Sequence, residues 1–224
     1  MLLSGHQPVY LPSILLFTKI AHSDEFMFTG HCQASPGTWH NRNQIRGAKL
    51  TIPVKHDFGQ SINETEFAGD HWKKKHLRSI EFAYGKRPFF KDYFPRIAEI
   101  ILLPALSLGL LNVRLIELFI EILELKTEML DSVDYPIEGH RTDMLISMCK
   151  ATGADQYLSN RGAMDYVDEE KMAGAGIKHR WLNFVHPIYD QGHSEFITNL
   201  SIIDLLFNCG PDSGRIVREA GSVG

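Results

Sequence analysis

Residues 5–12, with the sequence GHQPVYLP, carry the side chains best suited to chemistry. His6 can donate, accept or shuttle a proton near neutral pH, and Gln7 offers both a hydrogen-bond donor and an acceptor. Two prolines fix φ in this stretch, so its polar side chains are held in place. We predict that His6 is a catalytic acid or base and that Gln7 and Tyr10 contact the substrate. A rigid turn with a hydrogen-bonded histidine is the alternative interpretation.

A second polar stretch, HNRNQIR, spans residues 40–46. The guanidinium of Arg42 suits a phosphate or a carboxylate, and the amides of Asn41 and Asn43 suit a sugar or a base edge. We predict that these three residues bind the substrate. The alternative is a solvated loop whose turns are stabilised by asparagine.

Trp72, His76 and Tyr84 share one face of a helix expected over residues 70–84. We predict that they line a substrate pocket, where the aromatic rings form a wall together with Tyr10. The alternative is that His76 is a hydrogen-bonded histidine of the core.

Another polar cluster follows Pro187 and adds Tyr189, Gln191 and Asp204 as substrate-binding candidates. Asp204 falls in the first turn of a helix expected over residues 201–207. A carboxylate there also stabilises the helix dipole, so both roles stay open.

The formal net charge is −4, with 23 Lys and Arg against 27 Asp and Glu, which argues against a polyelectrolyte binder. Lys73, Lys74 and Lys75, followed by Arg78, are a local exception. Consecutive lysines fan around a helix and mostly contact water, and a nucleic-acid surface needs a wider basic area. We therefore expect a small-molecule substrate and no nucleic acid.

No metal site and no cofactor are predicted. The three cysteines form no CxxC pair, and His31, Cys32 and His40, the best local group, match no standard zinc spacing. The GxSxG, Walker A and GxGxxG motifs do not occur either.

The elements that would position these side chains alternate between strand and helix. A strand over residues 1–4, a helix over 13–21 and a strand over 25–28 form a βαβ unit, whose strands are usually parallel. Ligands bind at the carboxyl ends of such strands, so the turn after the first strand is a favoured place for a site. We expect an α/β fold with a mostly parallel sheet flanked by helices. Residues 1–220 should form a single domain, and residues 221–224 a flexible tail.

The few cysteines and the missing signal peptide favour a reducing cytoplasm. No run of about 18 apolar residues occurs, so no membrane span is expected. A homodimer is compatible with these features.

Taken together, the motifs resemble the WbqC-like protein family. The resemblance rests on GHQPVYLP, KIAHSDEF, NRNQI, the spacing of Trp72, His76 and Tyr84, GADQYLSN with Gly162, HPIYDQ and NLSIIDLLFNCG. One departure is Phe28-Thr29-Gly30, where an acidic residue is expected after the second strand. The resemblance implies a bacterial cytoplasmic protein that is often encoded beside surface-polysaccharide pathways, and an activity in group transfer.

Three functions follow as hypotheses. The first is a transferase that moves an aminoacyl or acyl unit onto a nucleotide-linked or phosphorylated substrate, such as an amino sugar or a modified nucleotide. The second is a nucleotidyltransferase-like enzyme that releases pyrophosphate and needs Mg²⁺. The third is a noncatalytic binding subunit of a biosynthetic complex. A buried polar cleft that joins His6, Arg42 and Tyr189 would favour catalysis, whereas a flat apolar patch would favour a partner surface.

Overall fold

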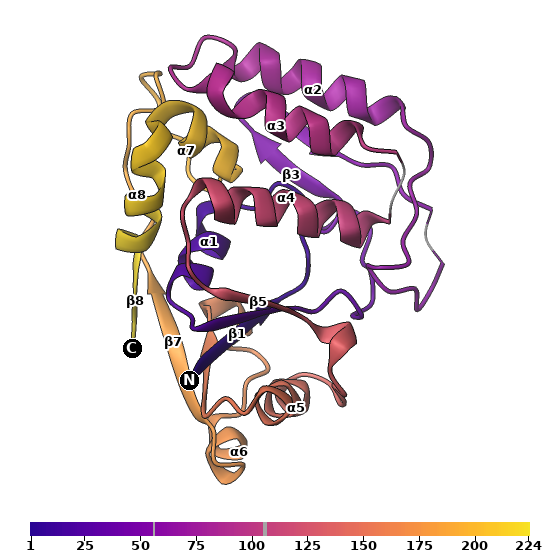
Figure 1. Cartoon of the computed structure of the whole chain (residues 1–224), viewed down its shortest axis with the longest axis vertical. Coiled ribbons are helices and arrows are strands. Elements are labelled where there is room, and N and C mark those ends of the chain that lie inside the picture. Colours follow the sequence, from indigo (N-terminus) through magenta and orange to yellow (C-terminus); the bar gives the residue numbers. More distant parts are fainter. Residues whose placement is uncertain (56, 105–106) are drawn as a thin grey trace.

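The first strand of the chain lies in the middle of its main sheet. The computed structural model describes residues 1–55, 57–104 and 107–224. The sheet contains six strands: β1 (Leu2–His6), β2 (Glu25–Phe28), β5 (Glu128–Asp131), β6 (Gln156–Ser159), β7 (Lys178–Phe184) and β8 (Gly221–Val223). Their order is β5-β2-β1-β6-β7-β8, as Figure 1 shows in part. The first four ladders are parallel and β8 runs antiparallel to β7, which confirms a mostly parallel α/β sheet that begins with a βαβ unit.

Helices cover both faces of this sheet. The α-helices are α1 (Ile14–Ala21), α2 (His71–Tyr84), α3 (Phe90–Leu102), α4 (Leu108–Ile122), α5 (Thr142–Thr152), α6 (Glu169–Gly174), α7 (Ile202–Cys209) and α8 (Ser213–Glu219). Short 3₁₀ turns lie at Ser132–Asp134, Arg161–Ala163 and Gly210–Asp212. Every helix in the described ranges is too short or too polar to span a bilayer.

Alternation along the strands sends side chains into two separate cores. Phe26 and Phe28 face the larger core, which also contains Phe17 of α1 and residues of α2, α3, α4 and α7. Leu3 and Met27 face a smaller core with α5 and α6. Figure 1 shows α2, α3 and α4 on one side of the sheet and α5 and α6 on the other.

The polar stretch over residues 40–46 contains a strand. β3 (Arg42–Ile45) pairs antiparallel with β4 (Ala48–Thr51), and these two strands form a separate small sheet. Ile45 and Leu50 are buried and anchor this hairpin, while Gly47 has a positive φ of 75° in the turn between the strands. β4 is therefore the second half of a hairpin outside the main sheet.

The last residues differ from the flexible tail expected over 221–224. Leu182 pairs with Val223 and Phe184 with Gly221, and the amide of Gly224 donates to the carbonyl of Trp181 at 2.9 Å. The backbone groups at the edge of β7 provide partners that local sequence does not reveal. Residues 221–223 thus form the edge strand β8.

Candidate active site

A pocket of about 880 Å³ lies at the carboxyl ends of β1, β2 and β6. The strand order places β2 and β6 on opposite sides of β1, so the winding of the sheet changes direction here. Open parallel sheets bind ligands at such topological switch points. We call this space the switch-point pocket. Its polar lining comes from His6, Gln7, Ser13, Lys19, Thr29, Cys32, Trp39, Asn43, Arg141, Tyr157, Ser159, Asn160, Tyr166 and Asn199.

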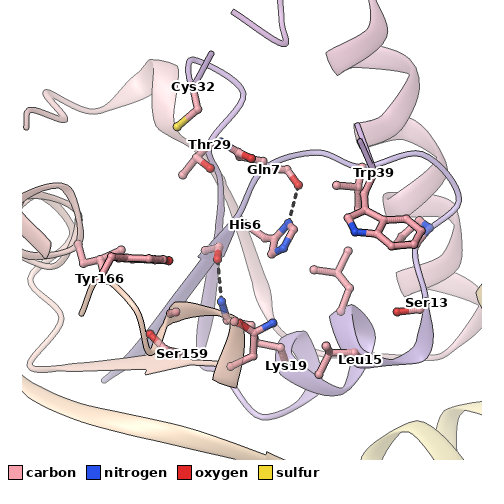
Figure 2. A pocket seen from close by; sticks show the side chains of 18 of the residues that line it. His6, Gln7, Ser13, Leu15, Lys19, Thr29, Cys32, Trp39, Ser159 and Tyr166 are labelled. Carbon is pink, nitrogen blue, oxygen red and sulfur yellow. Dashed lines mark hydrogen bonds between the residues drawn. The ribbon is translucent and has the colours of Figure 1, made fainter. Parts of the chain in front are cut away.

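His6 lies at the end of β1, two residues beyond the expected strand, because its backbone still pairs with Phe28 of β2. Figure 2 shows its imidazole in the middle of the pocket. Nδ1 lies 2.7 Å from the carbonyl oxygen of Gln7. A carbonyl can only accept, so Nδ1 carries the proton and Nε2 is left as a proton acceptor. Burial, followed by the charge of Lys19, lowers the pKa of His6 to about 4, so the ring is neutral at pH 7.

Lys19 is the second titratable group in the pocket, and the sequence analysis missed it. The side chain projects from α1 and is buried, and Nζ donates to the carbonyl of Gly5 at 2.8 Å (Figure 2). Burial lowers its pKa from 10.5 to about 7. Lys19 is the single charged residue of the helix ILLFTKIA, and that isolation in an apolar helix was the available signal.

Gln7 is fixed by His40. His40 Nε2 donates to Gln7 Oε1 at 2.7 Å, while the amide of Ser35 donates to His40 Nδ1 at 3.1 Å. These two bonds define one neutral tautomer of His40, whose pKa is lowered by burial. Gln7 therefore enters the pocket wall with its amide already oriented.

Two buried asparagines hold the turn that carries Gln7. Asn43 Nδ2 donates to the carbonyls of Tyr10 and Leu11 at 3.1 and 2.6 Å. Asn112 Nδ2 donates to Pro8 and to His40, at 3.2 and 2.8 Å. The turn is thus tied to β3 and to α4 rather than stabilised by its prolines alone.

Strained backbone occurs at the pocket. Four non-glycine residues in the described ranges have a positive φ, and two of them, Arg141 (φ 53°) and Asn199 (φ 59°), line the pocket. A third, Leu11 (φ 44°), lies in the turn held by Asn43. Such conformations cost about 1–3 kcal/mol each and cluster at functional sites.

The charged side chains that line the switch-point pocket in the described ranges are all basic. Lys19 and Arg141 line it, and none of its described lining residues is Asp or Glu. Thr29 occupies the place after β2 where an acidic residue was expected, which contributes to this balance. Trp39 stands at the mouth with 60% of its surface exposed and offers a flat face for a ring. The pocket is suited to an anionic ligand with a planar or sugar-like part.

Three of the predicted site residues, His6, Gln7 and Asn43, line this pocket. Asn41 is buried outside it and ties Gly37 to Ile52. Arg42 is exposed on β3 and is not among the described lining residues.

The predicted aromatic wall lies in the core instead. Tyr10, Trp72 and His76 are buried, and the Tyr10 hydroxyl lies 3.0 Å from Nδ1 of His76. The Tyr10 and Trp72 rings meet edge to face, with centroids 6.1 Å apart. Burial lowers the pKa of His76 to about 4, as for a neutral histidine packed in a core.

The remaining predicted residues meet around Arg46. Its amide donates to the Tyr84 hydroxyl at 3.0 Å, and its Nη2 donates to Gln191 Oε1 at 2.6 Å. Gln191 reaches the hydroxyl of Tyr189, which donates to Asp204 Oδ1 at 2.8 Å. Burial raises the pKa of Asp204. Tyr84, Tyr189, Gln191 and Asp204 therefore form a second polar network apart from His6.

His31 and Cys32, which were considered as zinc ligands, contact other groups. His31 Nδ1 lies 2.6 Å from the Ser132 hydroxyl, and Cys32 lines the pocket. Within residues 1–55, 57–104 and 107–224, no three His, Cys, Asp or Glu side chains converge as metal ligands.

Fold and pocket together define a doubly wound α/β protein with a pocket at its switch point, where open parallel sheets bind ligands. The chain belongs to the WbqC-like protein family, whose sequence profile matches residues 7–216. It is also similar to Uncharacterized protein Rv1507c of Mycobacterium tuberculosis (strain ATCC 25618 / H37Rv), with 34% identity over 224 residues, 95% of this chain and 97% of that protein. No solved structure matches the chain.

Proposed function

We propose that the switch-point pocket catalyses transfer of an acyl or aminoacyl group onto a nucleotide-linked or phosphorylated acceptor, such as an amino sugar or a modified nucleotide. The observation that carries this proposal is the neutral imidazole of His6, with Nε2 free to accept a proton, beside the buried amine of Lys19. His6 can accept a proton, and the protonated amine of Lys19 can bind a negatively charged group.

The transfer would proceed as a substitution at a carbonyl carbon. An amine of the acceptor attacks this carbon and forms the new C–N bond. The bond to the leaving group breaks, and its electron pair departs with that group. The proton lost by the amine passes to His6 Nε2, which returns it to the leaving group.

Lys19 and Arg141 would hold the phosphate or carboxylate of the substrate. Near neutral pH about half of the Lys19 amines carry a proton, because the pKa is about 7. An anion bound beside Lys19 raises this pKa, so substrate binding and protonation of Lys19 support each other. Trp39, at the mouth, would pack against a base or a sugar ring.

The lining favours this reaction over the two other hypotheses. Mg²⁺ is usually held by carboxylates, and the described lining residues include none, which disfavours a magnesium-dependent nucleotidyltransferase. The described lining of the pocket contains His6 without Arg42 and Tyr189, so the expected cleft joining all three is not formed. The concave shape and the polar groups disfavour a flat partner surface.

Thermal unfolding in the presence of candidate ligands tests the proposal. Wild type and His6→Ala are screened against nucleotides, nucleotide sugars, amino acids and acyl-coenzyme A. A ligand at a hundredfold excess over Kd stabilises the fold by about 2.7 kcal/mol. The matched control is His22→Ala, which removes a half-buried histidine that bonds to the Arg218 carbonyl and lies outside the pocket.

We expect a ligand that stabilises wild type and His22→Ala equally and supports turnover in both. His6→Ala should bind it and lose turnover by at least a hundredfold, the usual contribution of a general base. Full activity of His6→Ala, or no stabilisation by any ligand of these classes, would refute the proposal.

A further inference from the structure

A second hollow, of about 810 Å³, lies between α2 and the turn of the β3–β4 hairpin. Figure 1 shows α2 and β3 at the end of the molecule opposite α5 and α6. We call it the α2 groove. Its lining consists of Arg46, Gly47, Ala48, His71, Lys74, Lys75, Arg78, Ser79, Phe82, Ala83 and His193.

The α2 groove concentrates positive charge in a protein whose net charge is −4. Four of its described lining residues are Lys or Arg, two are His, and none is Asp or Glu. Lys74, Lys75 and Arg78 are exposed, and within the described ranges none of the three forms an ion pair. Their charges are therefore available to a ligand.

This placement does not serve the stability of α2. Lys74 and Lys75 lie in the first two turns of the helix, where the helix dipole is positive. Asp70 at the N-cap is the acidic residue at this end, and it pairs with Lys73 at 3.1 Å. Lys74 and Arg78 are four residues apart, a spacing at which like charges repel. Positive side chains at this end of a helix are unfavourable, and a bound anion would offset that cost.

Arg46 provides a fixed charge on the wall of the groove. Its Nη2 donates to Gln191 Oε1 at 2.6 Å and to the Glu195 carbonyl at 2.9 Å. Gln191 is held in turn by the amide and the carbonyl of Ile197, at 2.9 and 2.8 Å. Nε of Arg46 is buried and has no partner within the described residues. The guanidinium is therefore positioned before any ligand arrives.

Phe82 adds an aromatic surface on the rim of the groove. It lies one turn beyond Arg78 on α2 and is 95% exposed. An exposed phenyl ring beside several cations matches a ligand that joins an aromatic base to a chain of phosphates. The volume of the hollow, about 810 Å³, lies within the range of small-molecule sites.

We propose that the α2 groove is a second ligand site, which binds a nucleoside di- or triphosphate. Lys74, Lys75, Arg78 and Arg46 bind the phosphates, and Phe82 packs against the base. Gln191 is a positioning residue, because it acts by orienting Arg46. This site is separate from the switch-point pocket and independent of the transfer reaction proposed there.

Calorimetric titration tests the site with four probes: ATP, pyrophosphate, inorganic phosphate and a short single-stranded RNA. The test variant is Lys74→Gln/Lys75→Gln/Arg78→Gln. Lys91→Gln/Lys126→Gln/Lys150→Gln is the control, because it removes the same charge from exposed lysines that line neither pocket. His6→Ala is included to separate the two sites.

ATP and pyrophosphate should bind wild type, the control and His6→Ala alike, and at least tenfold more weakly to the test variant. Inorganic phosphate should bind more weakly than pyrophosphate, because it reaches fewer cations. Phe82→Ala should weaken ATP and leave pyrophosphate unchanged. The unliganded test variant should unfold at a temperature at least as high as wild type, because it lacks the like-charge repulsion. This shows that any loss of affinity is not a loss of fold.

Three results would overturn the proposal. One is ATP affinity that is equal in the test variant and in wild type. Another is the absence of ATP and pyrophosphate binding at low salt, where charge attraction is greatest. The third is tight binding of the RNA without binding of ATP, which would identify a nucleic-acid surface instead. Loss of ATP binding in His6→Ala would move the nucleotide to the switch-point pocket.

Discussion

His6 and Lys19 have opposite tasks in the proposed reaction, and this difference should appear in the pH profile. His6 must be neutral to accept a proton, and its pKa is about 4. Lys19 must be charged to hold an anion, and its pKa is about 7. We expect kcat/KM to fall below about pH 4 and above about pH 7, with a plateau between.

Variants of Lys19 test whether this residue causes the decline of kcat/KM at alkaline pH. Lys19→Arg keeps its charge, so the decline near pH 7 should disappear. Lys19→Met should lower kcat/KM across the whole plateau. An alkaline limb that persists unchanged in Lys19→Met would mean that another group titrates there.

Lys19 should also make the stability of the fold depend on pH. Its pKa is about 7 in the folded chain and 10.5 when exposed, so between these values the unfolded chain binds the extra proton. The free energy of unfolding therefore rises with pH in this window, by up to about 1.4 kcal/mol per pH unit. Urea unfolding at pH 7 and pH 9 should show this rise in wild type and a smaller one in Lys19→Met. Equal slopes would contradict the buried state of Lys19.

Replacement of Arg141 by glycine should stabilise the fold and weaken ligand binding. Its φ of 53° is strained for arginine and ordinary for glycine. Arg141→Gly should raise the free energy of unfolding by about 1 kcal/mol, because strain relief exceeds the entropy cost of glycine. The same variant should bind the anionic ligand at least tenfold more weakly. Arg141→Lys, which keeps both strain and charge, is the control and should change neither quantity greatly.

At the scale of elements, β3 holds the turn that carries Gln7 through a single side chain, that of Asn43. Asn43→Ala would leave the carbonyls of Tyr10 and Leu11 without their donor. A buried acceptor that loses its partner costs about 1–3 kcal/mol, so we expect a loss of this size or larger in urea unfolding. Ligand affinity should fall as well, because the turn carries Gln7. Arg42→Ala, one residue away and exposed, should be neutral in both assays.

Sequence reasoning predicted residues that line the switch-point pocket where it depended on strand ends. His6 and Gln7 follow from the rule that ligands bind at the carboxyl ends of parallel strands, and Asn160 after β6 obeys the same rule. Lys19 was not predicted, because helix periodicity shows which residues share a face of the helix and does not show which face borders a cavity. The network from Tyr84 to Asp204 was grouped with His6 because contacts between distant segments cannot be read from one sequence.

For the whole molecule, the last strand protects the edge of the sheet. Deletion of residues 221–224 would remove the partner of β7 and expose its unpaired amides and carbonyls. We expect a loss of about 1–2 kcal/mol in the free energy of unfolding and faster aggregation, because each net hydrogen bond contributes about 1 kcal/mol. Light scattering on heating measures the aggregation. Ser222→Ala keeps the backbone pairing and should behave as wild type.

The central place of β1 also governs the order in which the protein can fold. Leu2 to Ser4 are synthesised well before residues 156–158, which form one of the two strands that flank them. Pairing between segments so distant in the chain is slow, and until it occurs the β1 edge is open to association with other chains. The switch-point pocket is complete only when Ser159 and Asn160 have arrived beside His6. A ligand of this pocket would therefore bind only chains in which β6 has paired with β1, and its binding would distinguish fully folded chains from newly made ones.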